Sequence, residues 1–233
     1  MAFLPIFLDI IQTGSDTTGI AADASSAGSV TLLDLIMKGG LVMYPLILLS
    51  IIAVYLIVER LLTLRKADKD PEEFLEELSN YVAQGDLNSA KNLCKKYNTP
   101  FSRMLEKGVS KLGKPLPTIE ASIENVGKIE IYKLERNLNA LATISGAGPM
   151  IGFLGTVTGM VQAFIAIAQA EGTISPKLLS NGIYEAMLTT VAGLIVGIIA
   201  YIGYNYLTGK VEKIVHQMEY SSIEFIELLQ EPR

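Results

Sequence analysis

The sequence predicts an all-α integral membrane protein with three transmembrane helices, two of which extend far into the cytoplasm as a helical bundle. Half of the 233 residues are hydrophobic and only 18% are charged, compared with about 25% in an ordinary soluble domain. The hydrophobic residues gather in three uncharged runs, and most charges gather between the first run and the second. Apolar residues recur at helical spacing, and no run alternates as a strand does.

The three uncharged runs define the membrane spans. Residues 41–58 form a run of 18, residues 137–170 a run of 34 and residues 186–209 a run of 24. Each is long enough to cross a hydrocarbon core of about 30 Å at roughly 1.5 Å per residue. We therefore assign transmembrane helices to residues 39–62, 137–170 and 182–207, with a short loop at 171–181 between the last two.

Residues 63–136 form a water-facing helical domain. From Arg65 to Arg136 the chain carries 13 Lys or Arg and 12 Asp or Glu. Asp70 and Pro71 start one predicted helix, Gly85-Asp86 separates a second, and proline-containing turns at 100 and 115–118 bracket a third. From residue 118 to residue 170 the helical pattern is interrupted only by a proline, which predicts one long helix that begins in water and enters the membrane.

The third span also lacks a stop signal, so it should continue as a C-terminal helix over residues 208–233. Its predicted apolar stripe comprises Val211, Ile214, Val215, Met218, Ile223, Ile226 and Leu229. Basic residues follow the first and third spans and precede the second, which by the positive-inside rule places these ends in the cytoplasm and the N-terminus outside. The loop at 171–181 is then periplasmic.

Residues 1–38 should lie in the periplasm as an amphipathic helix and a linker. Apolar residues between positions 3 and 11 share one helical face, which suits a helix on the membrane surface. A cleaved signal peptide is the alternative, although the segment has no basic start and Asp9 interrupts it. Residues 13–29 are rich in Ser, Thr, Ala and Gly, a composition typical of a flexible linker.

The composition excludes several kinds of site. One cysteine, Cys94, rules out an internal disulfide and a paired-cysteine metal or redox centre. One histidine, His216, rules out a histidine-rich metal site, and a formal charge of −5 without tryptophan argues against nucleic-acid binding. No phosphate loop, nucleophile elbow or Ser-His-Asp arrangement is present. We expect no enzyme activity, no cofactor and no metal.

Small residues recur at intervals of three and four in the second and third spans, a pattern that lets membrane helices approach closely. The glycines that we assign to helix packing are Gly148, Gly152, Gly155, Gly159, Gly193 and Gly197. Packing within one chain is the simpler interpretation, and packing around a central channel is the alternative. Pro149 indicates a kink, which either frees carbonyl groups for a polar pathway or only improves packing.

Glu185 directly precedes the third uncharged run. A carboxylate near the bilayer core costs roughly 2.5–3.5 kcal/mol on insertion scales and is usually paired or functional. A glutamate at the outer interface is the other interpretation, and the sequence does not choose between them.

Three segments carry a resemblance to a known family. They are residues 40–46 (GLVMYPL), followed by Glu59-Arg60, residues 152–160 (GFLGTVTGM) and residues 182–194 (GIYEAMLTTVAGL). Together they resemble the ExbB/TolQ/MotA family of bacterial ion-driven motor subunits, most closely ExbB. The resemblance implies a homopentamer in the inner membrane, with an ExbD-type single-span partner inside a pore lined by the second and third spans. Proton flow past an aspartate of that partner would drive a TonB-type protein, which energises outer-membrane transporters.

The resemblance also implies roles for individual residues. Thr156 and Thr190 would line the pore, and Glu185 would lie at the pore near its outer side. Thr189 stands where a small apolar residue is expected, and this extra hydroxyl leaves open whether the ion is a proton or sodium. The alternatives to the ExbB role are TolQ-like envelope maintenance, a gliding-type stator subunit, and a structural membrane scaffold that conducts no ion.

Overall fold

The computed structural model describes residues 40–169 and 176–230, and within these ranges every regular element is a helix. The chain divides into two units, Met1–Gly40 and Leu41–Arg233, and all the described helices belong to the second. The predicted N-terminal amphipathic helix and residues 171–175 of the predicted loop lie outside the described residues. Residues 176–181, which the sequence also predicts as part of that loop, instead form the start of a helix. The all-α class is confirmed.

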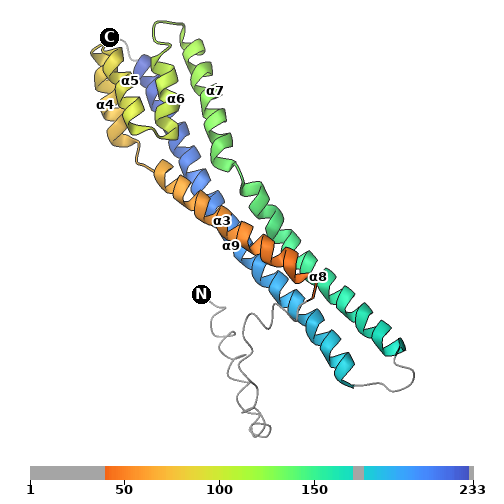
Figure 1. Ribbon diagram of the computed structural model, residues 1–233. Helices are drawn as coiled ribbons and strands as arrows, with labels where there is room; N and C mark the ends of the chain where they lie inside the picture. Colours follow the sequence, from red (N-terminus) through yellow and green to blue (C-terminus); the bar gives the residue numbers. More distant parts are fainter. Residues whose placement is uncertain (1–39, 170–175, 231–233) are drawn as a thin grey trace, which may run out of the picture. The chain divides into compact units, whose positions relative to one another are not determined.

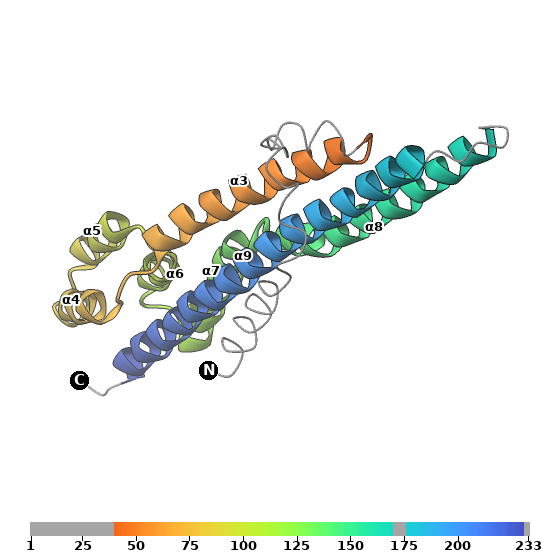
Figure 2. The same ribbon diagram turned by 90° about the horizontal axis from the view of Figure 1, so that it is seen from below.

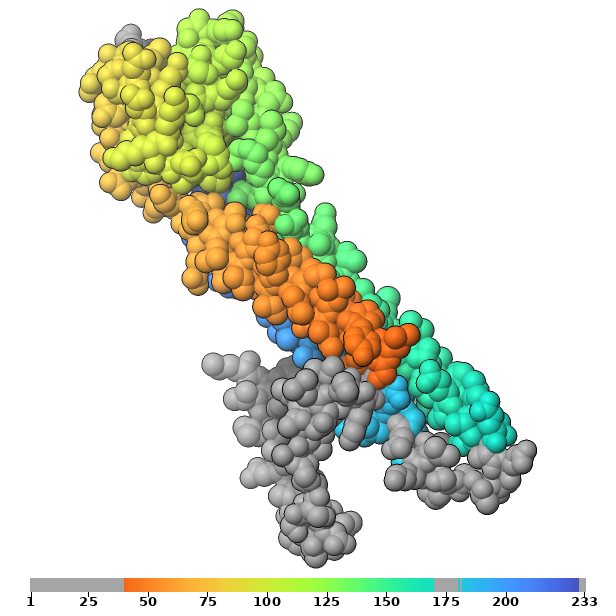
Figure 3. Space-filling model, in the orientation of Figure 1, coloured from red at the N-terminus to blue at the C-terminus, as the bar shows by residue number. Residues whose placement is uncertain are grey.

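Three helices are long and apolar enough to cross a membrane, as predicted. They are α3 (Met43–Ala67), α8 (Leu138–Gln169) and α9 (Pro176–Gln230). Helices α8 and α9 lie side by side, and α3 packs against both (Figures 1 and 2). The space-filling view shows α3 covering part of this pair (Figure 3). Large apolar side chains such as Ile51, Tyr55 and Phe153 point outward, as expected of a surface that faces lipid.

The predicted continuous helix over residues 118–170 is wrong, because two residues interrupt it. Helix α7 (Leu116–Glu135) ends before Arg136, whose ψ of 137° is extended, and α8 starts after Asn137. Asn137 has a φ of +67°, and its carbonyl accepts the first backbone hydrogen bond of α8 from Leu141. Asparagine adopts the left-handed conformation more readily than most residues. A single asparagine is a weak stop signal, so the periodicity concealed the break.

Three short helices precede α7, as the sequence predicts: α4 (Glu72–Ala83), α5 (Leu87–Tyr97) and α6 (Pro100–Val109). Asp70 accepts a hydrogen bond from the backbone N–H of Glu72, the first residue of α4. Pro71 therefore lies just before the helix instead of at its first position. Thr99 and Ser102 form a reciprocal capping box at the start of α6. These caps satisfy N–H groups that the first turn of a helix leaves unbonded.

We call α4 to α7 and the C-terminal part of α9 the polar bundle. In this part of α9 the buried residues are spaced alternately four and three apart, so the pattern repeats every seven residues. They are Leu207, Val211, Ile214, Met218, Ser221 and Phe225. The predicted stripe was therefore wrong at Ile223, which is 58% exposed, and it missed Phe225, which is 1% exposed. The seven-residue pattern passes through polar Ser221, whose hydroxyl donates to the Gln217 carbonyl, so hydrophobicity alone did not reveal it.

An ion-pair cluster joins the end of α3 to α9. The Asp68 carboxylate accepts hydrogen bonds from Lys213 Nζ at 2.8 Å and Lys210 Nζ at 3.1 Å. These two lysines, Lys213 foremost, hold the pKa of Asp68 below its ordinary value despite partial burial. The cluster ties the C-terminal end of α3 to α9 at the point where α9 enters the polar bundle.

Candidate ion pathway between helices α8 and α9

The backbones of α8 and α9 nearly touch where glycines face each other. A Cβ atom on Gly193 would lie 2.6 Å from the Gly148 carbonyl oxygen and 2.8 Å from the Gly152 Cα. A Cβ on Gly152 would lie 2.9 Å from the Thr189 carbonyl oxygen. Contacts this short involve backbone atoms, so no side-chain rotation could relieve them. The structure thus brings these predicted packing glycines together within one chain.

The other small residues continue this contact along the two helices. The added Cβ atoms of Gly155 and Gly159 would meet Thr189 and Ala186, respectively. A Cβ on Gly197 would lie 2.7 Å from the Pro149 ring and 3.1 Å from the Ser145 carbonyl oxygen. Proline cannot donate a hydrogen bond to that carbonyl, four residues before it. The Pro149 ring therefore packs against the space that Gly197 leaves.

Three threonine hydroxyls converge at the centre of this contact. The hydroxyls of Thr156 and Thr190 are hydrogen-bonded to each other across the two helices. Each also reaches the Gly152 carbonyl oxygen, at 3.3 Å from Thr156 and 3.2 Å from Thr190. Both side chains are partly exposed. Because a hydroxyl can donate and accept, this pair forms a polar spot that a further group can reach. We call the hydroxyl pair of Thr156 and Thr190 the threonine spot.

Thr189 differs from the other two threonines, since only 1% of it is exposed. Its hydroxyl donates to the Ala186 carbonyl at 2.8 Å and lies 3.4 Å from the Gly152 carbonyl oxygen. The side chain fills the space left by Gly155. Thr189 therefore packs inside the α8–α9 contact, and the structure does not place it on a surface where it could line a pore.

Glu185 lies one helical turn before Thr189 on α9 and is partly exposed. No ion pair to its carboxylate occurs among the residues that the structure describes. Its place beyond one end of the threonine spot agrees with either sequence interpretation, a pathway carboxylate or an interfacial one. No other carboxylate lies on α8 or on residues 176–211 of α9.

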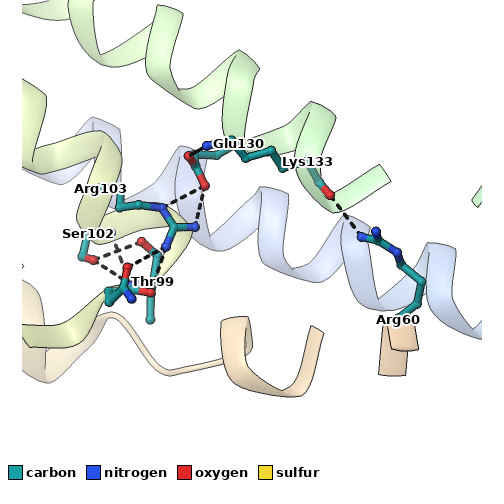
Figure 4. A network of polar contacts seen from close by, with 7 residues as sticks. Arg60, Thr99, Ser102, Arg103, Glu130 and Lys133 are labelled. Carbon is teal, nitrogen blue, oxygen red and sulfur yellow. Dashed lines mark hydrogen bonds and ion pairs between the residues drawn. The ribbon is translucent and has the colours of Figure 1, made fainter. Parts of the chain in front are cut away.

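A second polar cluster, which the sequence analysis missed, lies in the polar bundle (Figure 4). Glu130 on α7 is 3% exposed and accepts hydrogen bonds from Arg103 of α6, at 2.5 and 3.0 Å, and from Lys133 at 2.7 Å. Arg60 of α3 donates to the Lys133 carbonyl at 3.1 Å, in the last turn of α7. The cluster thus connects α3, α6 and α7.

Burial raises the pKa of Glu130, but its hydrogen bonds with Arg103 and Lys133 outweigh burial and lower the pKa overall. The carboxylate is therefore charged in the folded protein at neutral pH. The sequence did hold a signal for this buried glutamate. Glu130 lies three positions after Gly127, on the buried face of α7, but the apolar pattern favoured Ile131 as the buried residue there.

Comparison with known proteins identifies the family. The sequence model of the MotA/TolQ/ExbB proton channel family matches residues 96–220, more than half of the chain. The Synechocystis sp. protein called putative biopolymer transport protein ExbB-like 1 is 31% identical over 180 residues, which cover 76% of this chain and 70% of that protein. Biopolymer transport protein ExbB of Neisseria meningitidis serogroup A is 29% identical over 176 residues, covering 70% and 78%.

A shorter match points to another branch of the same family. The Tol-Pal system protein TolQ of Haemophilus influenzae is 38% identical over 85 residues, which cover 36% of this chain and 37% of that protein. The two ExbB-named relatives match most of the chain, and the part that the family model matches, residues 96–220, includes both Thr156 and Thr190. With its three helices long and apolar enough to span a membrane, the chain is a multi-pass membrane protein that belongs to the MotA/TolQ/ExbB proton channel family and most resembles ExbB.

Proposed function

We propose that this protein is the inner-membrane subunit of a motor driven by the proton motive force, which with an ExbD-type partner energises TonB-dependent transport across the outer membrane. The observation that carries the proposal is the hydroxyl pair of Thr156 and Thr190. It is a partly exposed polar spot on the uncharged parts of two helices, in a chain of a proton channel family. Ion movement through hydrocarbon requires such groups or water to face a cavity.

The proposal requires a second chain. The three uncharged runs contain no carboxylate, lysine, arginine or histidine, so this chain has no titratable group of these kinds at the centre of its spans. A carboxylate from an ExbD-type single-span subunit would accept hydrogen bonds from the two threonine hydroxyls. Several copies of the chain, five by resemblance to ExbB, would surround that subunit, and a TonB-type protein would transmit the work.

We place the protein in the bacterial inner membrane with its N-terminus in the periplasm and its C-terminus in the cytoplasm, following the distribution of basic residues. The outward apolar side chains of α3 and α8 would face lipid or neighbouring copies. Thr156, Thr190 and Glu185 remain in the proposed pathway, whereas we assign Thr189 to packing because it is buried.

The test is to replace Thr190 by valine, which removes the hydroxyl at nearly constant volume. The protein is produced in a bacterium that lacks its own ExbB, together with the cognate partners, and siderophore uptake is measured. A hydrogen bond to a charged group contributes about 1.5–3 kcal/mol, so uptake should fall roughly tenfold or more. Thr190→Ser should restore it.

Thr158→Val is the matched control. Thr158 lies on the same span as Thr156, but its hydroxyl donates only to carbonyl oxygens of its own helix, those of Leu154 and Gly155. This variant should retain uptake. If Thr190→Val assembles normally and supports wild-type uptake, the pathway role of Thr190 is wrong, and the structural scaffold becomes the better explanation.

The match to TolQ favours envelope maintenance as a second candidate function. Complementation distinguishes the two, because a strain that lacks TolQ becomes sensitive to detergents and a strain that lacks ExbB loses siderophore uptake. We expect this chain, with its partners, to restore uptake. Rescue of detergent resistance alone would assign it to the TolQ role.

A further inference from the structure

An acidic groove lies between α4 and the C-terminal end of α9. It encloses about 430 Å³. Its floor is apolar and includes the buried side chains of Leu78 and Phe225. Its rim carries four glutamates, Glu72, Glu76, Glu224 and Glu227. A groove with an apolar floor and an acidic rim suits a segment that presents cations beside apolar groups.

The rim charges are not neutralised within the chain. No ion pair to any of these four glutamates occurs in the described residues. Glu224 accepts a hydrogen bond from the Tyr220 hydroxyl at 2.6 Å. That bond raises the pKa of Tyr220, and the charges of Glu224, Glu72 and Glu227 raise it further. The groove is therefore a site of concentrated negative charge.

A basic counterpart lies where α6 ends and the chain turns towards α7. We call Lys107, Lys111 and Lys114 the lysine turn. None of the three forms an ion pair within the described ranges. They lie close together, since the positive charges of Lys114 and Lys107 lower the pKa of Lys111. Leu112, beside Lys111, adds a partly exposed apolar group to the turn.

The groove and the lysine turn lie at the same level of the polar bundle. Gly108, next to Lys107, packs so closely on Phe225 of the groove floor that an added Cβ would lie 2.9 Å from the Phe225 ring. Helices α4 and α7 nevertheless lie on either side of the C-terminal end of α9 (Figures 1 and 2). Copies in one membrane share one orientation, so a cyclic ring can join only surfaces at the same level. A ring also needs two different complementary surfaces on each copy.

We propose that the acidic groove of one copy binds the lysine turn of a neighbouring copy, so that this contact repeats around the ring. The proposal rests on the homo-oligomer of the proposed function and identifies one of its contacts. Exposed ion pairs contribute little to binding energy, so the contact fixes the order and register of neighbours more than it holds them together. It should weaken as salt screens the charges.

Cross-linking between two differently tagged copies tests the contact. One copy carries Glu227→Cys and the other Lys111→Cys, so any link between these cysteines joins two chains. The native Cys94 is buried and its pKa is raised to about 12, so it stays an unreactive thiol. A short bismaleimide is added to membranes that contain the assembled complex, and the linked product is detected through both tags.

The matched control replaces Glu212 instead of Glu227. Glu212 is also an exposed glutamate on α9, but it lies 15 residues earlier, about 22 Å along the helix. We expect the 227–111 pair to cross-link at least fivefold more than the 212–111 pair. Lys107→Glu and Lys114→Glu in the Lys111→Cys copy should reduce the product several-fold, and Glu72→Lys with Glu76→Lys in the other copy should restore it.

Native mass spectrometry of the same samples separates the two possible failures. If the protein is oligomeric but the two cysteine pairs link equally or not at all, the groove contact is wrong and the proposed function is untouched. Links from position 227 to a different protein, with none to position 111, would also overturn it. A monomer in membranes and mild detergent would reject both the contact and the oligomer on which it rests.

Discussion

The absence of one atom, the glycine Cβ, sets how closely α8 and α9 approach. Backbone atoms of Gly148 and Gly152 occupy the space in which a Gly193 side chain would begin. In hydrocarbon no hydrophobic effect drives helices together, so van der Waals contact and interhelical hydrogen bonds must do so. The same closeness brings the hydroxyl of Thr190 within 3.2 Å of the Gly152 carbonyl oxygen. The glycines therefore create the polar spot as well as the packing.

Gly193→Ala should force the two helices apart and destabilise the protein by about 1–3 kcal/mol, as overpacking of a tight contact does. Gly146→Ala is the control, because a Cβ there meets nothing within 4 Å. The measurement is thermal unfolding in mild detergent, compared among the wild type and both variants. Equal stability of the two variants would show that α8 and α9 are not in close contact at Gly193.

At the scale of helices, the sequence predicted the type of every described element but not all of their ends. Charge-free runs and a cap such as Asp70 are local signals. The break at Asn137 depends on the left-handed backbone conformation of a single residue. Another helix supports this region, because Arg60 of α3 donates a hydrogen bond to the Lys133 carbonyl. Such support comes from tertiary packing, which periodicity along one helix cannot reveal.

The candidate site shows the same contrast between what local sequence signals reveal and what only tertiary packing decides. The resemblance identified Thr156, Thr190 and Thr189 as candidate pathway residues, but the two adjacent threonines on α9 have opposite surroundings. Thr189 points into the contact and Thr190 towards its edge, a difference of about 100° around the helix. Only the relative rotation of α8 and α9 decides which hydroxyl stays accessible. The buried Glu130 was missed for a similar reason, since its partner Arg103 lies 27 residues away.

The Glu130 cluster joins α6 to α7, and its loss should loosen that pair. Glu130→Gln should reduce the free energy of unfolding by about 1–2 kcal/mol near pH 7, because Arg103 loses a charged partner but stays partly hydrated. Glu124→Gln is the control; its exposed pair with Lys128 contributes only about 0.2–0.5 kcal/mol. Denaturant unfolding of both variants in mild detergent measures the difference.

The pH dependence gives an independent check of the same cluster. The pKa of Glu130 is lowered from its ordinary value of 4.5 on folding. Its contribution to stability is therefore fully present above pH 4.5 and is lost as the pH falls through the lowered pKa of the folded state. The stability difference between wild type and Glu130→Gln should shrink across that acidic window. A constant difference from neutral to acidic pH would contradict a charged Glu130.

For the whole molecule, the polar bundle keeps an apolar surface that one chain does not cover. Ile129 and Tyr132 of α7 are 55% and 74% exposed, although the domain around them is rich in charges. Both lie outside the apolar spans, so lipid is not the expected cover. A large aromatic side chain in water is typical of a surface that binds another protein. A neighbouring copy is the cover that the proposed oligomer supplies.

We therefore expect the purified protein to be oligomeric in mild detergent without any partner. Tyr132→Glu should shift native mass spectra towards smaller species, because association would bury an unpaired carboxylate at the cost of apolar contact. Tyr132→Phe, which keeps the ring, should leave the distribution unchanged. A wild-type monomer would contradict the oligomer itself. An unchanged oligomer for Tyr132→Glu would show instead that this face of α7 stays in water, and the contacts between copies would have to lie elsewhere.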